Sequence, residues 1–185
     1  MIDANDILWE GPQGALIRHR SMGDNSHSTT VLSKSEQDRC FFSGRTYHSH
    51  LEFNLTAAAS AFIKLVSTND FCISHIEFEI DDSVLRLQIK NGGTESGTYS
   101  TALPIIKSNS MSNTPAVASG MTMTTGGTHS GGNVLMLEKI SATKNGALIQ
   151  EDQLIGLPSG NHFVYIENVG NQSINGLIVM RWSEY

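Results

Sequence analysis

Charged residues and long apolar runs are both scarce in this chain. Only 16% of its 185 residues are charged, and the formal net charge is -6. An acidic chain lacks the basic surface with which proteins bind nucleic-acid phosphates. No uninterrupted stretch reaches the roughly eighteen apolar residues that a transmembrane helix needs. We therefore expect neither a nucleic acid nor a membrane among its partners.

Cysteine is scarce as well, because Cys40 and Cys72 are the only two. They form no CxxC motif, which excludes a zinc ribbon and a thioredoxin-like site. The first residues, Met1 to Asp6, are acidic and lack the basic-then-apolar order of a signal peptide. We expect synthesis in a cytoplasm with both thiols free, and a single disulfide between them is the alternative.

Helical periodicity is missing too, and strand-like alternation takes its place. From Tyr47 to Leu55 the odd-numbered positions are mostly apolar and would face a core, and the even-numbered ones are polar. Phe71 to Lys90 alternates most clearly on both sides of a turn at Asp81 to Ser83, and predicts a hairpin. Its inward positions include Ile76, Phe78, Ile80, Leu85, Leu87 and Ile89.

The end of the chain, Leu157 to Tyr185, predicts a second hairpin. Phe163–Asn168 and Ile174–Trp182 are rich in apolar residues, and a polar Gly/Asn/Gln/Ser turn separates them. Other strands are expected over residues 61–67, 99–106, 121–125, 134–140 and 148–155. About eight strands with local connections predict an all-β fold: an antiparallel two-sheet sandwich, jelly-roll-like, over residues 46–185, preceded by an extended N-terminal arm over residues 1–45.

One constellation could hold a metal. His48, His50 and Glu52 share one face of a strand, and His162 follows a Pro158 to Gly160 turn. Together they resemble the two motifs of cupins, although the carboxylate comes too early and His162 lies one residue too close to Gly160. The opposite face of the same strand must enter the core, so these side chains are expected to face outward. We expect no metal and no other cofactor, and no catalytic residue.

The order of features from Tyr47 onward resembles that of tailed-bacteriophage virion proteins built as small β-sandwiches. The landmarks are the Arg45–His50 entry, the Ile73–Ile89 hairpin, the polar Lys107–Asn113 segment, the Gly126–Gly132 loop, the Leu157–Gly160 turn and the final Arg181–Glu184 strand. The resemblance covers about three quarters of the chain and does not include residues 1–45.

This resemblance implies a non-enzymatic structural protein of the virion, assembled in the host cytoplasm. It favours a head decoration or cement protein that binds the major capsid protein, or another virion protein, in many copies. It also implies self-association, with a homotrimer favoured over a dimer. The alternatives are a tail- or fibre-associated domain that binds a receptor or glycan through residues 108–113 and 126–132, and a cupin-like metalloenzyme.

The N-terminal arm is the expected attachment to the partner. Its residues occur in short apolar patches within a polar background, and such a segment buries too little to fold alone. The apolar anchors would be Ile7, Leu8, Trp9, Leu16 and Ile17, and Arg18 and Arg20 would pair with acidic neighbours. The sequence itself does not tell head from tail attachment.

Overall fold

The structure is a computed structural model of the whole chain. It describes residues 6–10, 15–22, 26–33, 40–41, 43–80, 84–108, 117–141, 146–149 and 155–185. Side chains are described for residues 40–41, 43–80, 84–108, 117–139 and 155–185.

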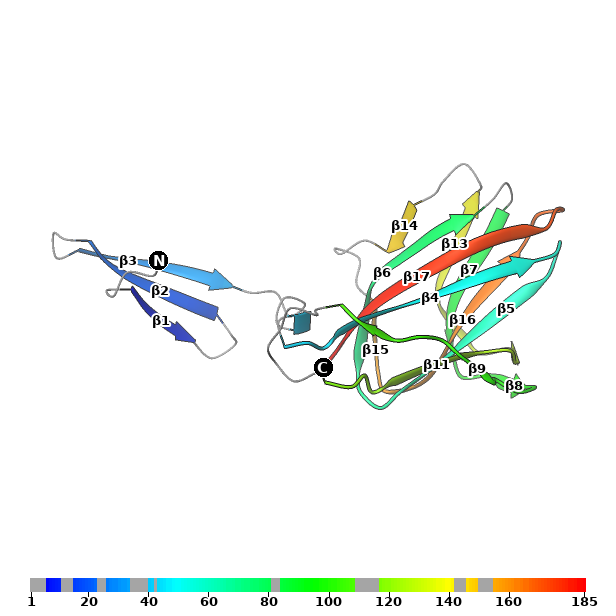
Figure 1. The fold of residues 1–185 in the computed structure, drawn as a ribbon, viewed down its shortest axis with the longest axis horizontal. Helices are drawn as coiled ribbons and strands as arrows, with labels where there is room; N and C mark the ends of the chain where they lie inside the picture. The colour runs from blue at the N-terminus through cyan, green and yellow to red at the C-terminus, as the bar shows by residue number, and fades with distance from the viewer. Residues whose placement is uncertain are drawn as a thin grey trace.

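The described residues form β-strands joined by turns (Figure 1). The strands are β1 (Asp6–Glu10), β2 (Ala15–Met22), β3 (Ser26–Ser33), β4 (Thr46–Leu55), β5 (Ser60–Ser67), β6 (Phe71–Ile80), β7 (Val84–Asn91), β8 (Thr94–Ser96), β9 (Thr101–Ala102), β10 (Ile106–Lys107), β11 (Met121–Thr125), β12 (Thr128–Ser130), β13 (Asn133–Ser141), β14 (Gly146–Ile149), β15 (Ile155–Leu157), β16 (Gly160–Asn168) and β17 (Ile174–Glu184).

Two antiparallel sheets form the sandwich. The β17 sheet has the order β10-β4-β17-β6-β14, and β15 also pairs with β6. The β16 sheet has the order β13-β7-β16-β5-β11-β9. When β8 to β12 and β15 are left out, eight strands remain, and the first, eighth, third and sixth lie in one sheet and the fifth, fourth, seventh and second in the other. This is the strand order of a jelly roll, so the predicted fold class is confirmed.

The two predicted hairpins are wrong in their pairing. β6 and β7 lie in different sheets, and so do β16 and β17. The turn after each first strand carries the chain across the sandwich instead of back along the same sheet. Both strands of each pair still bury their apolar sides, because they face the core from opposite layers. Alternation therefore predicted the inward residues correctly and the partner strands incorrectly.

The other departures lie between β7 and β13 and around β14 and β15. The strand expected over 99–106 is reduced to β9 and β10, on either side of Pro104, which has no N–H to donate to a ladder. The loop expected over 126–132 contains β12, which pairs with β8. The strand expected over 148–155 overlaps the ends of β14 and β15, and residues 150–154 lie outside the described chain.

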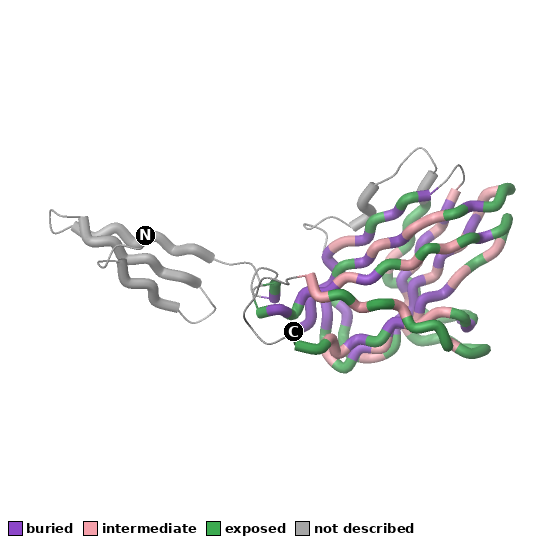
Figure 2. The backbone as a smooth tube through the Cα atoms, in the orientation of Figure 1, coloured by how far each residue is buried: buried purple, intermediate pink, exposed green. Residues whose placement is uncertain are grey.

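The core lies between the two sheets, as the inward rows of purple in Figure 2 show. β6 and β7 have alternating burial, with Phe78, Leu85, Leu87 and Ile89 nearly or fully buried. Trp182 on β17 is 0% exposed and is the largest buried side chain. Each such aliphatic or aromatic side chain contributes about 1.5–3 kcal/mol through burial, which makes this interior the main source of stability.

Residues 1–45 contain three strands in an antiparallel meander, β1-β2-β3. The Cα register pairs Trp9 with Ile17 and Ile17 with Val31. These strands were not predicted from the sequence, because Ile7, Leu8 and Trp9, and likewise Leu16 and Ile17, are consecutive rather than alternating. The boundary of the arm near residue 45 stays a prediction.

Candidate functional site

The predicted histidine face is the outer face of the β17 sheet. His50 and Glu52 are exposed and His48 is half-buried on β4, while Tyr47 and Ser49 on the other side of the strand are buried. His48 Nδ1 lies 3.2 Å from Ser108 Oγ. Partial burial lowers the pKa of His48 below its usual value, and the charges of Arg181 and His50 lower it further.

His162 lies on the opposite side of the β17 sheet from those residues, inside the sandwich. It is 2% exposed on β16, and its Nε2 lies 2.9 Å from the carbonyl oxygen of Pro158. That carbonyl can only accept, so Nε2 carries the hydrogen. The structure therefore does not bring His162 together with His48, His50 and Glu52. Among the described residues no group of three His, Cys, Asp or Glu side chains could hold a metal ion.

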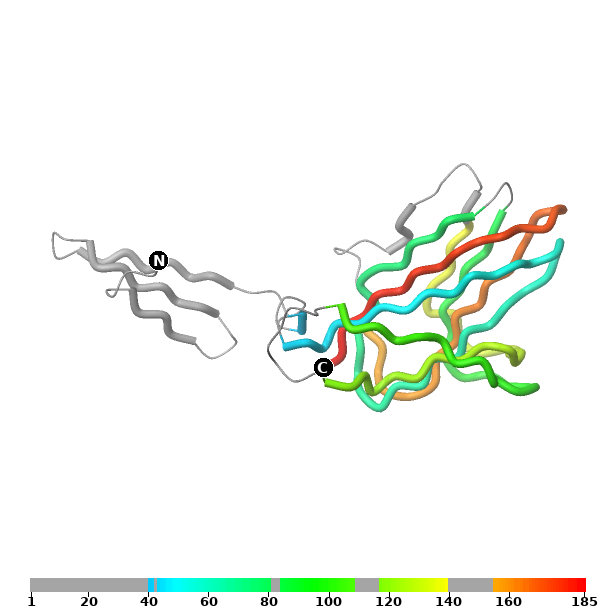
Figure 3. Tube along the Cα trace, in the orientation of Figure 1, coloured from blue at the N-terminus to red at the C-terminus, as the bar shows by residue number. Residues whose placement is uncertain are grey.

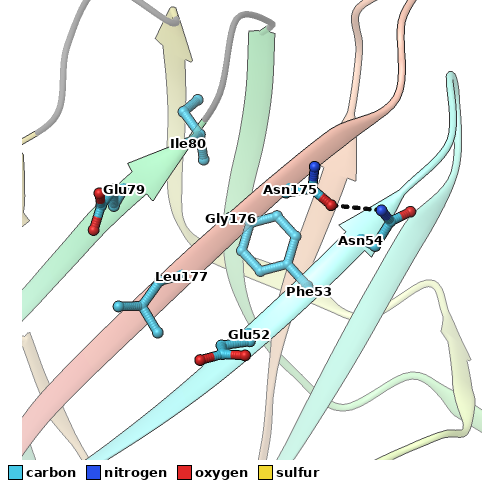
Figure 4. Close-up of a pocket in the computed structure, with 8 residues that line it drawn as sticks. All are labelled: Glu52, Phe53, Asn54, Glu79, Ile80, Asn175, Gly176 and Leu177. Atoms are coloured by element: carbon cyan, nitrogen blue, oxygen red, sulfur yellow. Dashed lines mark hydrogen bonds between the residues drawn. The ribbon is translucent and has the colours of Figure 1, made fainter.

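A broad groove opens on the outer face of the β17 sheet beside these residues. It has a volume of about 560 Å³ and is lined from β4, β17 and β6 (Figure 4). Leu177 is the cross-strand partner of both Glu52 and Glu79, so the two carboxylates flank an aliphatic side chain. The groove thus combines an apolar floor with acidic walls.

Gly176 lies at the upper end of this groove, and it shares the inward side of β17 with the buried Ile174 and Ile178. A Cβ placed on it would lie 2.4 Å from Cζ of Phe53 and 3.0 Å from Cγ2 of Ile80. The two flanking side chains thus occupy the space that a larger residue would need. Next to them, Asn54 Nδ2 donates to Asn175 Oδ1 at 2.6 Å, which joins β4 to β17 at the surface (Figure 4).

The β8–β12 ribbon covers part of the outer face of the β16 sheet. His129 of β12 stacks on Phe163, with ring centroids 3.9 Å apart, and also contacts Phe62. His129 Nε2 lies 2.6 Å from the carbonyl oxygen of Gly92, so it carries the hydrogen. This part of the loop predicted to bind a receptor is a packed element. Most of the other predicted loop, residues 109–113, lies outside the described chain.

Basic side chains surround this aromatic cluster. Lys64 Nζ pairs with Glu95 Oε2 at 2.5 Å, and Arg86 Nη1 pairs with Glu167 Oε2 at 2.7 Å. Lys90 Nζ lies 4.8 Å from the centre of the Tyr165 ring, a cation–π distance. The outer face of the β16 sheet is therefore basic and aromatic.

The most elaborate polar site in the described chain is centred on Glu184, which is only 2% exposed. Its Oε1 accepts from Ser119 Oγ at 2.5 Å and Trp182 Nε1 at 3.1 Å. Its Oε2 accepts from the Gly120 amide at 2.8 Å and Asn69 Nδ2 at 3.1 Å. Four donors satisfy the buried carboxylate, so it fastens residues 119–120 and Asn69 to the last strand.

Neighbouring groups extend this network toward the segment that precedes β4. The Cys40 thiol donates to the Glu184 carbonyl at 3.5 Å, and the Glu184 amide donates to the carbonyl of Arg45 at 3.0 Å. Tyr47 Oη donates to the Val117 carbonyl at 3.0 Å. Burial raises the pKa of Tyr47 and the Glu184 charge raises it further, while Arg45 opposes both effects.

Above this network the end of the sandwich presents large apolar side chains. Phe41 is 40% exposed, Val117 42% and Tyr185 43%. Val117 and Tyr185 line a hollow of about 150 Å³ together with Arg45 and Glu184. We name Phe41, Val117 and Tyr185 the end surface. Figure 3 shows residues 40–45 and the C-terminus at this same end, with the β16–β17 turn at the other.

The end surface could not be recognised from the sequence. Its three residues are far apart in the sequence, and each is an isolated apolar residue in a short connection or at the terminus. The only local signal is the position of Phe41 directly before the predicted sandwich.

The predicted attachment residues lie on β1 and β2. The register pairs Leu8 with Arg18 and Asp6 with Arg20. Their side chains lie outside the described part of the structure, as do those of Ile7, Trp9, Leu16 and Ile17. Their role in binding a partner stays a prediction.

Cys40 and Cys72 are both buried, and the structure joins neither of them in a disulfide. Burial raises the pKa of the Cys72 thiol, and a hydrogen bond with Tyr185 partly opposes this. No helix in the described part of the chain is long and apolar enough to span a membrane.

Comparison with known proteins gives distant likenesses only. No family model matches the chain, and no curated protein does. Two similar solved structures are those of the infectious bursal disease virus Gt strain and of T=1 particles derived from infectious bursal virus. Both are 10% identical, with TM-scores of 0.22 and 0.20, and the match covers 91% of this chain but only 46% of each of theirs. TM-scores of this size do not establish a shared fold.

Proposed function

We propose that this chain is a non-enzymatic structural protein of a virion, and most specifically a decoration or cement protein on the head of a tailed bacteriophage. Its partner is the major capsid protein, or another virion protein, bound in many copies. The chain itself forms a homo-oligomer, for which the resemblance favours a trimer over a dimer.

The observation that carries this proposal is the end surface. Three large apolar side chains are about two-fifths exposed there, at the end of the jelly roll where residues 40–45 and the C-terminus lie. Clustered exposed apolar side chains favour a protein partner, because burying them against another surface removes them from water. The end surface is therefore the part of the described sandwich that best suits a protein partner.

The order of sequence landmarks supports the virion class. The segment Arg45–His50 enters β4, Lys107 at the start of the Lys107–Asn113 landmark ends the short strand β10, and Arg181–Glu184 completes β17. Many identical weak contacts also suit a protein that covers a shell, since multivalent attachment multiplies modest affinities. Neither argument depends on a catalytic group.

The experiment compares particles assembled with and without this chain. Particles from the genome that encodes it are prepared with the coding sequence deleted, and purified protein is added back and co-sedimented. The full chain should bind at many copies per particle. A chain of residues 40–185 should fold, because its core cluster runs from Tyr47 to Trp182, and it should bind far more weakly.

Two point variants refine the test. Val117→Asp places a charge in the end surface and should reduce binding at least tenfold. Asn171→Lys changes the exposed turn at the opposite end of the sandwich and should bind like the parent chain. Full occupancy by residues 40–185 and by the Val117→Asp variant would show that attachment uses neither region, and the proposal would fail.

A further inference from the structure

The two outer faces of the sandwich carry opposite charge among the described side chains. The outer face of the β17 sheet presents the carboxylates of Glu52, Glu77 and Glu79 against the single guanidinium of Arg181. The outer face of the β16 sheet presents Lys64, Arg86, Lys90 and Lys139 against Glu95 and Glu167. One face is therefore net acidic and the other net basic.

The positive surplus has a definite position. Lys64 and Arg86 are paired with their carboxylates across the face. Lys90 and Lys139 have no carboxylate partner among the described residues, and they lie on β7 and β13, at one side of the sheet. The surplus charge thus borders the edge strand of the β16 sheet.

Each charged region also has an apolar centre. On β13, Leu137 is 56% exposed and Val134 is 49% exposed. They are the cross-strand partners of Gln88 and Lys90, so they lie on the same basic face. On the other sheet, Leu177 lies between Glu52 and Glu79 at the groove of about 560 Å³. An apolar centre with a charged border is the usual composition of a protein interface.

We propose that these two faces bind each other in successive copies of the chain. Leu137 of one copy enters the groove of the next and contacts Leu177. Lys90 and Lys139 then oppose Glu52 and Glu79 of the neighbouring copy. The partner is a second copy because every chain carries both complementary surfaces: the acidic face with its groove and the basic face with its exposed apolar side chains.

Such an interface is heterologous, since one face contacts a different face of the neighbour. A contact of this type closes into a ring when the rotation between copies allows it, and otherwise continues as an open array. It does not generate a two-fold dimer. The interface therefore gives a ring or an open array, not a two-fold dimer, and links the self-association to named residues.

The experiment uses the purified full chain alone, without particles, and measures mass by size exclusion with light scattering. One variant combines Glu52→Lys with Glu79→Lys, and another combines Lys90→Glu with Lys139→Glu. Each variant has two outer faces of like charge and should remain a monomer at concentrations where the parent chain associates. An equal mixture of the two should associate again, because each then meets a face of opposite charge.

Two controls keep the result specific. Asn171→Lys changes the charge at a turn off both faces and should leave the association unchanged. Lys139→Glu alone, at an exposed position, weakens the interface without altering the Lys90–Tyr165 contact. Raising the salt from about 0.05 M to about 0.5 M should also weaken the parent association, because it shortens the Debye length severalfold.

The proposal is overturned if the parent chain is a monomer at all accessible concentrations, if both charge-reversed variants associate like the parent, or if their mixture stays monomeric. None of these results bears on particle binding through the end surface, which is measured separately. Conversely, a chain that associates as proposed but does not bind particles would retain this inference and lose the proposed function.

Discussion

Replacement of Glu184 by glutamine should destabilise the sandwich more than any other single isosteric change at a carboxylate in the described chain. The carboxylate is 2% exposed and accepts four hydrogen bonds, two on each oxygen. Glutamine keeps the shape but puts an amide NH2 where one oxygen was. Two of the four donors would then face another donor.

The expected loss can be worked from these contacts. A hydrogen bond to a charged group contributes about 1.5–3 kcal/mol, so two lost bonds cost about 3–6 kcal/mol. The amide is easier to bury than the carboxylate, and this offsets part of the cost. We expect a net loss of about 3 kcal/mol. With a urea m-value of about 2 kcal/mol/M, the midpoint should fall by about 1.5 M.

Urea unfolding followed by tryptophan fluorescence measures this directly, because Trp182 donates to Glu184 and is itself fully buried. The matched control is Glu77→Gln, since the Glu77 side chain is 57% exposed and its change should stay within about 0.5 kcal/mol. All variants are compared at one protein concentration. A Glu184→Gln midpoint within about 0.2 M of the parent, with an unchanged slope, would refute the reasoning.

Three further predictions concern other parts of the sandwich. Because the folded-state pKa of His48 lies below its unfolded value of about 6.5, the unfolded chain binds that proton more readily. Stability should therefore fall as the pH drops below about 6.5. His48→Asn should make stability depend less on pH, and urea midpoints that change equally with pH in both proteins would contradict this prediction. Gly176→Val should cost about 1–3 kcal/mol by overpacking against Phe53, and Phe53→Ala in the same chain should recover part of the loss in thermal unfolding. Cys40 and Cys72 are buried and should react with a thiol reagent only after unfolding, and a disulfide-linked peptide in non-reducing mass spectrometry would contradict this prediction.

The inward residues of the long strands could be predicted from the sequence because alternation records which side of a strand is buried. This held for β4, β6 and β7, where apolar residues such as Phe78 and Leu87 enter the core. The jelly-roll class followed from the number and spacing of such strands. The short strands β8 and β12 could not be predicted, since three residues are too few to show a period and their pairing depends on distant segments.

The site residues depend even more on distant contacts. From the sequence alone, Glu184 would be expected at the exposed polar end of a strand. In the structure it is buried by Asn69 and Ser119, which lie 115 and 65 residues away. The end surface likewise requires Phe41, Val117 and Tyr185 to lie at one end of the fold. By contrast, the outward direction of His48 was predictable, because the other face of its own strand is apolar.

The placement of β6 and β7 in different sheets, in place of the predicted hairpin, explains why the two outer faces differ in charge. In a hairpin, Glu77 and Glu79 of β6 would lie beside Arg86 and Lys90 of β7 and neutralise them across the ladder. The jelly-roll order puts the two strands in opposite sheets, so the acidic positions and the basic positions emerge on opposite outer faces. Charges that local pairing would have cancelled are kept apart by the thickness of the core. Only another molecule can then bring them together, and a second copy of this chain presents both signs in the required places.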